Sequence, residues 1–402
     1  MSWIKNLAVI TLSLMFSMFF LEIGLRYIYP NIVSFTEVRD HSDPFIPRHK
    51  TGSHAHAARN SLATFDTNGM RINPNQCEEQ ETVKALLVGD SNIAGLFLND
   101  SETLGAKITE HSMTTNLCVS VDTFGVSGFG PDQTLFAIDE FTSVNAYDYV
   151  IFHIFADNDL GDLVRNNNFR NDRLSNNGYC FPERPLLERF VLYKAVRKAL
   201  YVMGLEVNLY GKAISSSGLD DSCTIVLNPN NENFADSMHQ RANLDWQVNR
   251  NNQRQIYMDD RYDIEFACNK APDAQDYVSR YLDRIIDASN RLSYERNFEL
   301  IYLIQPSEDD VTNNHPKRSD KDCEQYNPNN LTQFFVNALD GQNVINLYES
   351  FFECSACYFI EEELVGDNHW SPYGVNIAAT YVVDHIAGNP ENLLSMDILL
   401  TE

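Results

Sequence analysis

From residue 84 onward, short apolar runs alternate with longer amphipathic segments, and this alternation constrains the fold more than any other feature of the chain. The first three apolar runs have the length of buried strands, and the segments between them have helical periodicity. We predict strands at residues 84–89, 117–125 and 147–156, with helices at residues 102–111 and 133–141. Parallel strands need crossover connections, which are usually helical and right-handed. The pattern therefore predicts an α/β fold, a three-layer α/β/α sandwich around a mainly parallel sheet.

The alternation stops and then resumes closer to the C-terminus. This second part contains predicted helices at residues 273–296, 331–339 and 373–386 and predicted strands at residues 298–306 and 343–348, which complete a five-stranded sheet. Residues 160–271 interrupt the pattern and form a predicted insertion. It leaves the C-terminal end of the third strand, the edge at which α/β sheets bind ligands. A lid or specificity subdomain and mere additional bulk both agree with that position.

The first 30 residues are more apolar than the rest of the chain. Residues 7–21 carry no charge, and a helix of about 19 residues at ~1.5 Å each spans about 28 Å, enough to cross the hydrocarbon core of a bilayer. No small-residue cleavage site follows residue 21, and the aromatic residues near position 28 are typical of an interfacial belt. We therefore predict an uncleaved transmembrane helix at residues 1–30, which attaches the chain to the lipid bilayer. A linker and lead-in segment at residues 31–80 then joins it to a globular domain at residues 81–402, in the periplasm or outside the cell.

The composition excludes one class of partner and indicates a compartment. A formal net charge of -26 repels phosphate backbones, so we expect no binding of nucleic acid. The eight cysteines form an even set in the predicted exported part, which suits a compartment that permits disulfides. Cys77 precedes one predicted strand and Cys118 opens another, so this pair is the best single candidate for a disulfide. Cys354 and Cys357 lack a second closely spaced Cys or His pair for a zinc site, so a disulfide role is favoured for them as well.

Four short stretches fall at corresponding ends of the alternation. Ser91 follows the first predicted strand, residues 125–133 (GVSGFGPDQ) follow the second, residues 155–159 (FADND) follow the third, and residues 366–374 (GDNHWSPYG) precede the last helix. The C-terminal ends of parallel strands share one edge of the sheet. We therefore expect these stretches to meet there, although they are far apart in the sequence.

With these stretches in this order, the chain resembles the SGNH (GDSL-like) hydrolase and acyltransferase superfamily, whose four blocks supply a serine, a glycine, an asparagine and a histidine. The blocks look like residues 89–91, 125–130, 158–159 and 367–370. Residues 67–71 (TNGMR) also resemble a segment that precedes the first block in membrane-anchored members. The resemblance implies a flavodoxin-like sheet and serine-dependent esterase or acyl-transfer chemistry, which requires neither a cofactor nor a metal.

Carried over to this chain, the resemblance makes Ser91 the nucleophile, His369 the base and Asp367 the acid that orients the base. The backbone amides of Ser91 and Gly128 and the side-chain amide of Asn158 then form the oxyanion hole. General chemistry requires the same roles, because a serine hydroxyl needs an imidazole to take its proton and a carboxylate to hold that imidazole. The charge that develops on the attacked carbonyl oxygen needs donors that already point at it.

The chain departs from the family pattern at two positions. Gly366 stands where the family often has an aspartate three residues before the histidine, and Asp367 has the spacing of the related Asp-x-His-Trp acyltransferases. Ala156 replaces the glycine with which the third block usually begins. Of the second-block glycines at positions 125, 128 and 130, Gly128 fits the pattern best, although the other two stay open as donors.

Other catalytic and binding motifs are absent from the sequence. The serine at position 91 lacks the second glycine of a Gly-x-Ser-x-Gly elbow, and the chain has no phosphate-binding loop and no dinucleotide-binding glycine spacing. The sequence therefore favours a serine esterase that removes a small acyl group, such as acetyl, from a carbohydrate or another envelope ester. An O-acyltransferase that modifies a cell-surface glycan is the first alternative. An anchored binding or scaffold protein without turnover is the second.

Overall fold

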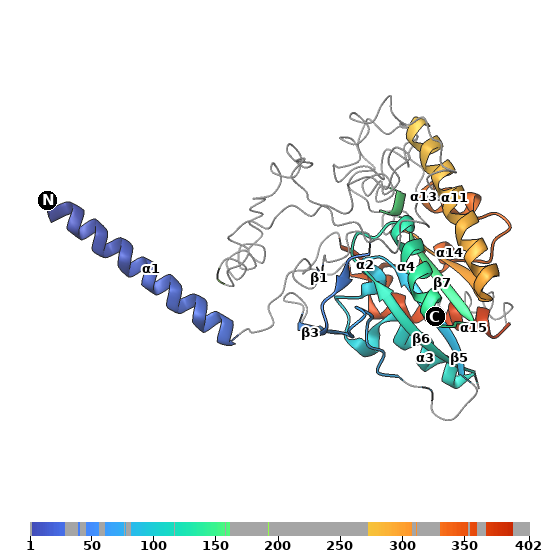
Figure 1. Ribbon diagram of the computed structural model, residues 1–402, viewed down its shortest axis with the longest axis horizontal. Coiled ribbons are helices and arrows are strands. Elements are labelled where there is room, and N and C mark those ends of the chain that lie inside the picture. Colours follow the sequence, from blue (N-terminus) through green and yellow to red (C-terminus); the bar gives the residue numbers. More distant parts are fainter. Residues whose placement is uncertain are drawn as a thin grey trace.

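A computed structural model gives the fold of the chain (Figure 1). Apart from residues 160 and 192, the predicted insertion at residues 160–271 lies outside the described part of the chain. The structure describes residues 2–28, 39–40, 46–55, 61–75, 77, 82–115, 117–156, 158–160, 192, 272–307, 311, 330–352, 354–359 and 367–388.

A five-stranded parallel sheet lies at the centre of the domain. Its strands are β5 (Thr82–Gly89), β6 (Cys118–Gly125), β7 (Tyr149–Phe155), β8 (Glu299–Gln305) and β9 (Val344–Asn346), in the order β6-β5-β7-β8-β9. Every one of these strands coincides with a predicted strand to within a few residues. The first strand lies between the second and the third, which is the flavodoxin-like order. The prediction of a five-stranded parallel sheet is therefore confirmed.

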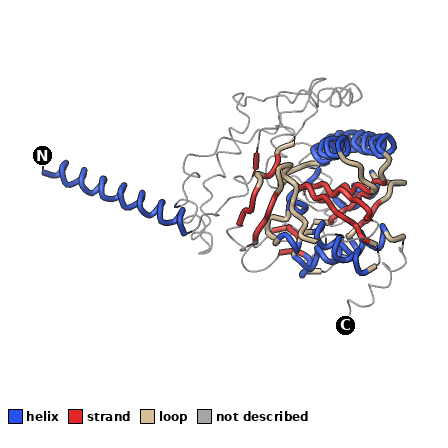
Figure 2. The backbone as a smooth tube through the Cα atoms, turned by 60° about the horizontal axis from the view of Figure 1, so that its bottom comes forward, coloured by secondary structure: helices blue, strands red, loops and turns tan. Residues whose placement is uncertain are grey.

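Helices cover both faces of this sheet, as Figure 2 shows. They are α3 (Leu104–Thr114), α4 (Pro131–Val144), α11 (Pro272–Arg296), α13 (Asn330–Ala338) and α15 (Pro372–Ile386). Side chains alternate between the two faces of a strand. Leu86 and Val88 of β5 therefore pack with residues of α4, α11 and α13, whereas Ala85 and Leu87 pack with residues of α3 and α15. The three-layer prediction is confirmed.

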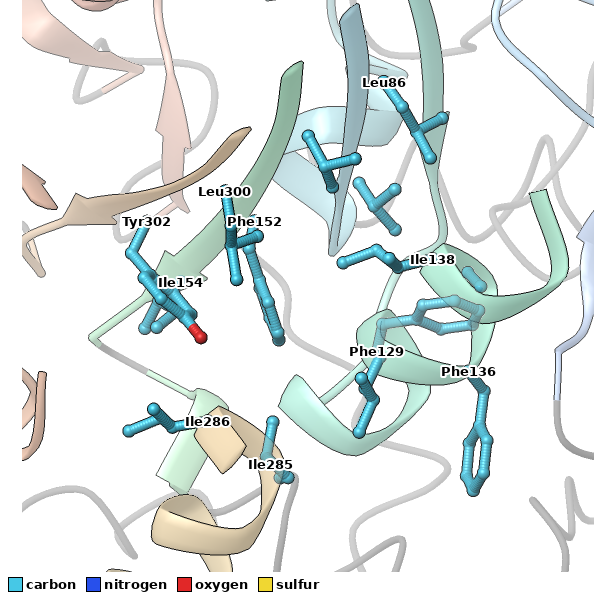
Figure 3. Packing of buried hydrophobic residues seen from close by; sticks show 14 of the residues in the cluster. Leu86, Phe129, Phe136, Ile138, Phe152, Ile154, Ile285, Ile286, Leu300 and Tyr302 are labelled. Carbon is cyan, nitrogen blue, oxygen red and sulfur yellow. The ribbon is translucent and has the colours of Figure 1, made fainter. Parts of the chain in front are cut away.

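The first of these two clusters has an aromatic centre. Figure 3 shows Phe129 beside α4 and Phe152 on β7 among the aliphatic side chains of the sheet and of α11. The rings of Phe152 and Tyr302 also contact each other at a tilt of 31°, with ring centroids 5.4 Å apart. Burying each large apolar side chain in such a cluster contributes about 1.5–3 kcal/mol. These contacts hold the strand ends, and hence the residues that follow them, in fixed positions.

Local sequence signals explain where the elements begin and end. α4 begins at Pro131, two residues before its predicted start, because proline suits the first turn, where an N–H has no helical partner. α15 begins at Pro372 after Ser371, whose Oγ accepts a hydrogen bond from the Gly374 amide at 3.2 Å. The strand predicted at residues 343–348 is shorter in the structure, because Tyr348 already begins α14 (Tyr348–Phe351).

Before the first sheet strand, the chain forms one long helix and several short strands. These elements are α1 (Ser2–Ile28), β1 (Arg39–Asp40), β2 (Arg48–His49), β3 (Gly52–Ala55) and β4 (Leu62–Phe65). Helix α1 covers the apolar segment that the sequence predicts to be helical. Among the described residues, no helix combines the length and the apolar character that crossing a membrane requires. β3 and β4 form an antiparallel hairpin, and Arg71 bridges Phe65 of this hairpin to Thr123 of β6.

Two disulfides are present in the described part of the chain. Cys77 and Cys118 are bonded, as predicted, and this bond lies at the N-terminal end of β6. Cys354 and Cys357 are also bonded, which confirms a disulfide role for this pair. The second bond brackets the 3-10 turn η5 (Ser355–Cys357), which leads into β10 (Tyr358–Phe359). β10 pairs antiparallel with β11 (Asp367–Trp370).

Candidate active site

Ser91 lies at the C-terminal end of β5, where the sequence predicts it. β5 ends at Gly89, and Asp90 caps the short helix α2 (Ser91–Ala94), whose first residue is Ser91. Asp90 Oδ1 accepts a hydrogen bond from the Asn92 amide at 2.9 Å, and Asp90 Oδ2 lies 3.5 Å from Ser91 Oγ. The Asp90 carboxylate therefore fixes the turn that presents the half-buried Ser91.

The stretch after β6 packs directly against α2. A Cβ on Gly125 would lie 2.2 Å from the amide nitrogen of Ala94, so only glycine permits this approach. Gly130 is the N-cap of α4. Gly128 lies in the turn between them with φ 75°, a left-handed conformation that glycine adopts readily. Gly125 and Gly130 thus have structural roles, and Gly128 stays the predicted oxyanion donor of this stretch.

Asn158 follows β7 at the same edge of the sheet. The turn around it is held by Asp159, whose Oδ2 accepts a hydrogen bond from the Phe155 amide at 2.9 Å. Asn158 is half-buried, and its side-chain Oδ1 has no hydrogen-bond partner among the residues that the structure describes. Its role as an oxyanion donor stays a prediction.

His369 lies on β11, which contacts α2. The amide of Trp370, the next residue, donates a hydrogen bond to Asn92 Oδ1 at 3.0 Å, across 278 positions of the sequence. The His369 ring meets the ring of Phe97 edge-on, with centroids 4.7 Å apart. The structure therefore brings the neighbours of Ser91 and of His369 into direct contact.

Asp367 begins the same strand. Its backbone pairs with Phe359 of β10, which places it two residues before His369 on one short strand. The side chains of Asp367 and Asn368 lie outside what the structure describes. The orienting role of Asp367 therefore stays a prediction.

Arg71, the last residue of the TNGMR segment, is buried and has a structural role that the sequence does not predict. It is 3% exposed, and its guanidinium donates to the carbonyl oxygens of Ala94 at 2.7 Å and Leu98 at 2.7 Å. Its Nε also donates to Asp100 Oδ1 at 2.8 Å. Burial lowers the pKa of Arg71, and the charge of Asp100 opposes this shift. Arg71 holds the loop that carries Phe97, and through it the ring contact to His369.

His153 on β7 is a second buried residue that the sequence reasoning missed. Its Nε2 lies 3.0 Å from Gln305 Oε1, and its Nδ1 lies 3.6 Å from Asp90 Oδ1. Its ring also meets the Trp370 ring edge-on, with centroids 5.2 Å apart. Burial lowers the pKa of His153 to about 3, against the opposing hydrogen bond to Gln305, so the ring is neutral at physiological pH. A histidine inside an apolar strand is the only sequence signal for this residue.

The comparisons with known proteins find distant structural likeness only. One similar structure is the crystal structure of a member of the lipolytic protein G-D-S-L family from Veillonella parvula DSM 2008, with a TM-score of 0.34 and 9% sequence identity. The alignment covers 75% of this chain and 97% of the Veillonella chain. A second crystal structure has a TM-score of 0.33 and 11% sequence identity, and its alignment covers 77% of this chain and 99% of the chain in that structure. No protein-family profile matches the sequence, and no curated protein matches it.

Proposed function

We propose that this chain is a serine-dependent esterase, which removes a small acyl group such as acetyl from a carbohydrate or another envelope ester. The hydrogen bond from the Trp370 amide to Asn92 Oδ1, 3.0 Å long, carries this proposal. It joins the residue after Ser91 to the residue after His369, and this supports a site in which the predicted nucleophile and base lie close together. Phe97 lies six residues after Ser91, the first residue of α2, and the contact of its ring with His369 supports the same arrangement.

The proposed reaction has two halves. In the first, Ser91 Oγ attacks the carbonyl carbon of the ester while His369 takes the hydroxyl proton and Asp367 orients the imidazole. The bond to the alcohol then breaks, and His369 returns the proton to the leaving oxygen. In the second, His369 takes a proton from a water molecule whose oxygen attacks the acyl-serine carbonyl carbon. The bond between this carbon and Ser91 Oγ then breaks, His369 returns the proton to Ser91 Oγ, and the carboxylic acid leaves. The amides of Ser91, Gly128 and Asn158 stabilise the charge on the carbonyl oxygen in both halves.

Hydrolysis and transfer differ only in what attacks the acyl-serine. In the alternative O-acyltransferase, the hydroxyl of a cell-surface glycan takes the place of water. We propose hydrolysis, because water needs no second binding site. Transfer and a scaffold without turnover are therefore outcomes of the test below.

The test uses the full chain with p-nitrophenyl acetate and a serine-directed fluorophosphonate probe. We expect steady ester turnover, labelling at Ser91, and loss of both in Ser91→Ala. Ser143→Ala is the matched control, because Ser143 is exposed on α4 and its hydroxyl donates to the Glu140 carbonyl oxygen of the same helix. Labelling with turnover that rises on adding a glycan acceptor would indicate transfer. No labelling of Ser91 would contradict the proposal and favour the scaffold.

We also propose that the chain is attached to a lipid bilayer through its N-terminal helix and lies outside the cytoplasm. The two disulfides support an oxidising compartment. Apolar side chains along α1, such as Met15 and Phe20, are exposed and would be covered by lipid. We expect the chain to resist alkaline extraction of membranes and to be digested by protease added outside spheroplasts. Release at alkaline pH would refute attachment, and protection from protease would refute the location.

A further inference from the structure

A buried polar group lies beneath the turn that carries Ser91. Its three side chains come from the ends of three neighbouring strands: Asp90 follows β5, His153 is on β7 and Gln305 ends β8. They are 2%, 1% and 0% exposed. We call these three side chains the buried polar cluster. All three carry polar atoms, and burying polar groups costs stability unless these atoms find hydrogen-bond partners.

The position of the proton on His153 decides what this group does. The neutral ring carries one N–H, either at Nε2, 3.0 Å from Gln305 Oε1, or at Nδ1, 3.6 Å from Asp90 Oδ1. Asp90 Oδ1 already accepts the Asn92 amide, so it serves as an acceptor. An Nδ1 without hydrogen would direct its lone pair at this oxygen, whereas an Nδ1–H directs a donor at it.

The surroundings of the Gln305 amide support the arrangement in which His153 Nδ1 carries the hydrogen. With Gln305 Oε1 facing His153 Nε2, two buried nitrogens, His153 Nδ1 and Gln305 Nε2, have no hydrogen-bond partner among the described residues. A half turn of the amide about its last side-chain bond exchanges its oxygen and nitrogen, two atoms of similar size. Gln305 Nε2 then donates to His153 Nε2, and His153 Nδ1–H is directed at Asp90. This rotation gives Gln305 Nε2 a hydrogen-bond partner and leaves the hydrogen of His153 Nδ1 facing Asp90 Oδ1, 3.6 Å away.

We propose that His153 is a positioning residue whose Nδ1–H faces Asp90 Oδ1, 3.6 Å away, and whose electrostatic attraction holds in place the carboxylate that caps α2 and faces Ser91 Oγ. This inference rests on the proposed function, since it concerns the placement of the predicted nucleophile. Gln305 in turn fixes the ring of His153 from the next strand.

The packing around the ring makes it a link between both halves of the site. A Cβ on Gly89 would lie 2.8 Å from His153 Cβ and 2.9 Å from Nδ1, so glycine lets the ring lie against the end of β5. On its other side the ring contacts Trp370, the neighbour of His369. A displaced ring therefore shifts the Ser91 turn and the His369 strand relative to each other.

Two substitutions separate positioning from packing. His153→Asn keeps an amide nitrogen at the place of Nδ1, and His153→Gln keeps one at the place of Nε2. We expect His153→Asn to retain kcat on p-nitrophenyl acetate within a few-fold, and His153→Gln to lower kcat by about 100-fold with little change in KM. Packing alone predicts the reverse order, because asparagine is smaller and leaves the larger cavity. Thermal unfolding of both full-length variants shows whether each still folds.

A second measurement is independent of turnover. The full chain, labelled with ¹⁵N at its ten histidines, is examined by NMR near neutral pH, and the His153 signals are those lost in His153→Asn. The couplings between ring nitrogens and ring protons show which nitrogen carries hydrogen. A proton on Nδ1 supports the proposal, and a proton on Nε2 overturns it.

If the wild-type chain neither hydrolyses esters nor labels at Ser91, the proposed function fails, while the NMR result still decides the proton position. With turnover present, equal loss of kcat in both variants, or greater loss in His153→Asn, overturns the positioning role.

Discussion

One side-chain oxygen joins the two segments on which the proposed chemistry depends. Asn92 follows the predicted nucleophile, and its Oδ1 accepts the amide hydrogen of Trp370, which follows the predicted base. Both residues are buried, so water cannot replace the bond without a rearrangement. The bond therefore contributes to stability and also sets the distance between the Ser91 turn and the His369 strand.

Replacing Asn92 tests this double role. In Asn92→Ala the Trp370 amide loses its acceptor, so we expect the free energy of unfolding to fall by about 1–3 kcal/mol and kcat to fall by about 100-fold as His369 shifts. Urea unfolding and p-nitrophenyl acetate turnover measure the two effects. Asn337→Ala is the control, because Asn337 is exposed on α13 and its side-chain oxygen accepts a hydrogen bond from Gln333 of the same helix. Unchanged turnover in Asn92→Ala would show that the bond does not place His369.

At the scale of single residues, the sequence predicts candidate catalytic residues but not the residues that hold them in position. Ser91 and Asn158 follow strand ends that hydrophobic periodicity reveals, so their edge of the sheet is predictable. Asn92, His153 and Arg71 matter because of partners far away in the chain, and no local pattern encodes such partners. Their only local sign is a polar side chain within an apolar or helix-starting segment.

Among the elements, the two disulfides lie at opposite ends of the sheet and have different loop lengths. Cys77–Cys118 closes a separation of 41 residues at the N-terminal end of β6. Cys354–Cys357 closes a separation of 3 residues, and the Cys357 carbonyl accepts the Ser371 amide at 2.9 Å where β11 passes into α15. A Cβ on Gly374 of α15 would lie 2.3 Å from the same carbonyl oxygen, so this turn packs tightly against the start of that helix. The short-loop disulfide therefore supports the strand of His369.

Removing each disulfide should separate stability from activity. Chain entropy predicts a loss of about 4 kcal/mol for Cys77→Ala/Cys118→Ala and about 2 kcal/mol for Cys354→Ala/Cys357→Ala. We expect the order to reverse in kcat, with a clear loss for the second variant and little change for the first. Urea unfolding and ester turnover on both variants give the comparison. If kcat stayed at the wild-type value without Cys354–Cys357, this turn would have no part in placing His369.

The sequence predicts long elements better than short ones. The strands and helices of the central sandwich have enough residues to display a period, and each appears in the structure close to its predicted place. β10 and β11 are too short for a period, and they are strands only because they pair with each other. β3 and β4 lie in a polar stretch, and a few buried residues such as Ala63 and Phe65 hold them near the edge of the sheet. Such elements depend on tertiary contacts, which local propensity does not reveal.

For the whole molecule, one principle makes the site predictable: parallel strands end at one edge. Ser91, the turn of Gly128 and Asn158 each follow a strand of the same sheet, so their common edge follows from the strand pattern alone. The fourth stretch follows no strand of this sheet. It reaches the edge through β11, which pairs with β10 and contacts α2, and only the folded chain shows that connection.

Burial of His153 also makes the stability of the whole domain depend on pH. The pKa of His153 falls from its ordinary value of 6.5 to about 3 in the folded chain, because burial disfavours the charged ring. Below about pH 6.5 the unfolded chain therefore binds a proton that the folded chain does not. The stability tied to the neutral ring is fully present above about pH 6.5, and it is lost as the pH falls toward about 3, at ~1.4 kcal/mol per pH unit.

His153→Asn removes this titration and thus isolates it. Between about pH 7.5 and about pH 5, we expect the free energy of unfolding of the wild type to fall by about 2 kcal/mol more than that of the variant. Burial also lowers the pKa values of His111 and His385, but these groups are present in both proteins, so their effect cancels in the comparison. Urea unfolding at the two pH values provides the measurement. Parallel losses in the two proteins would mean that His153 takes up its proton in the folded state as readily as in the unfolded state, and a neutral ring beneath Ser91 would then be ruled out.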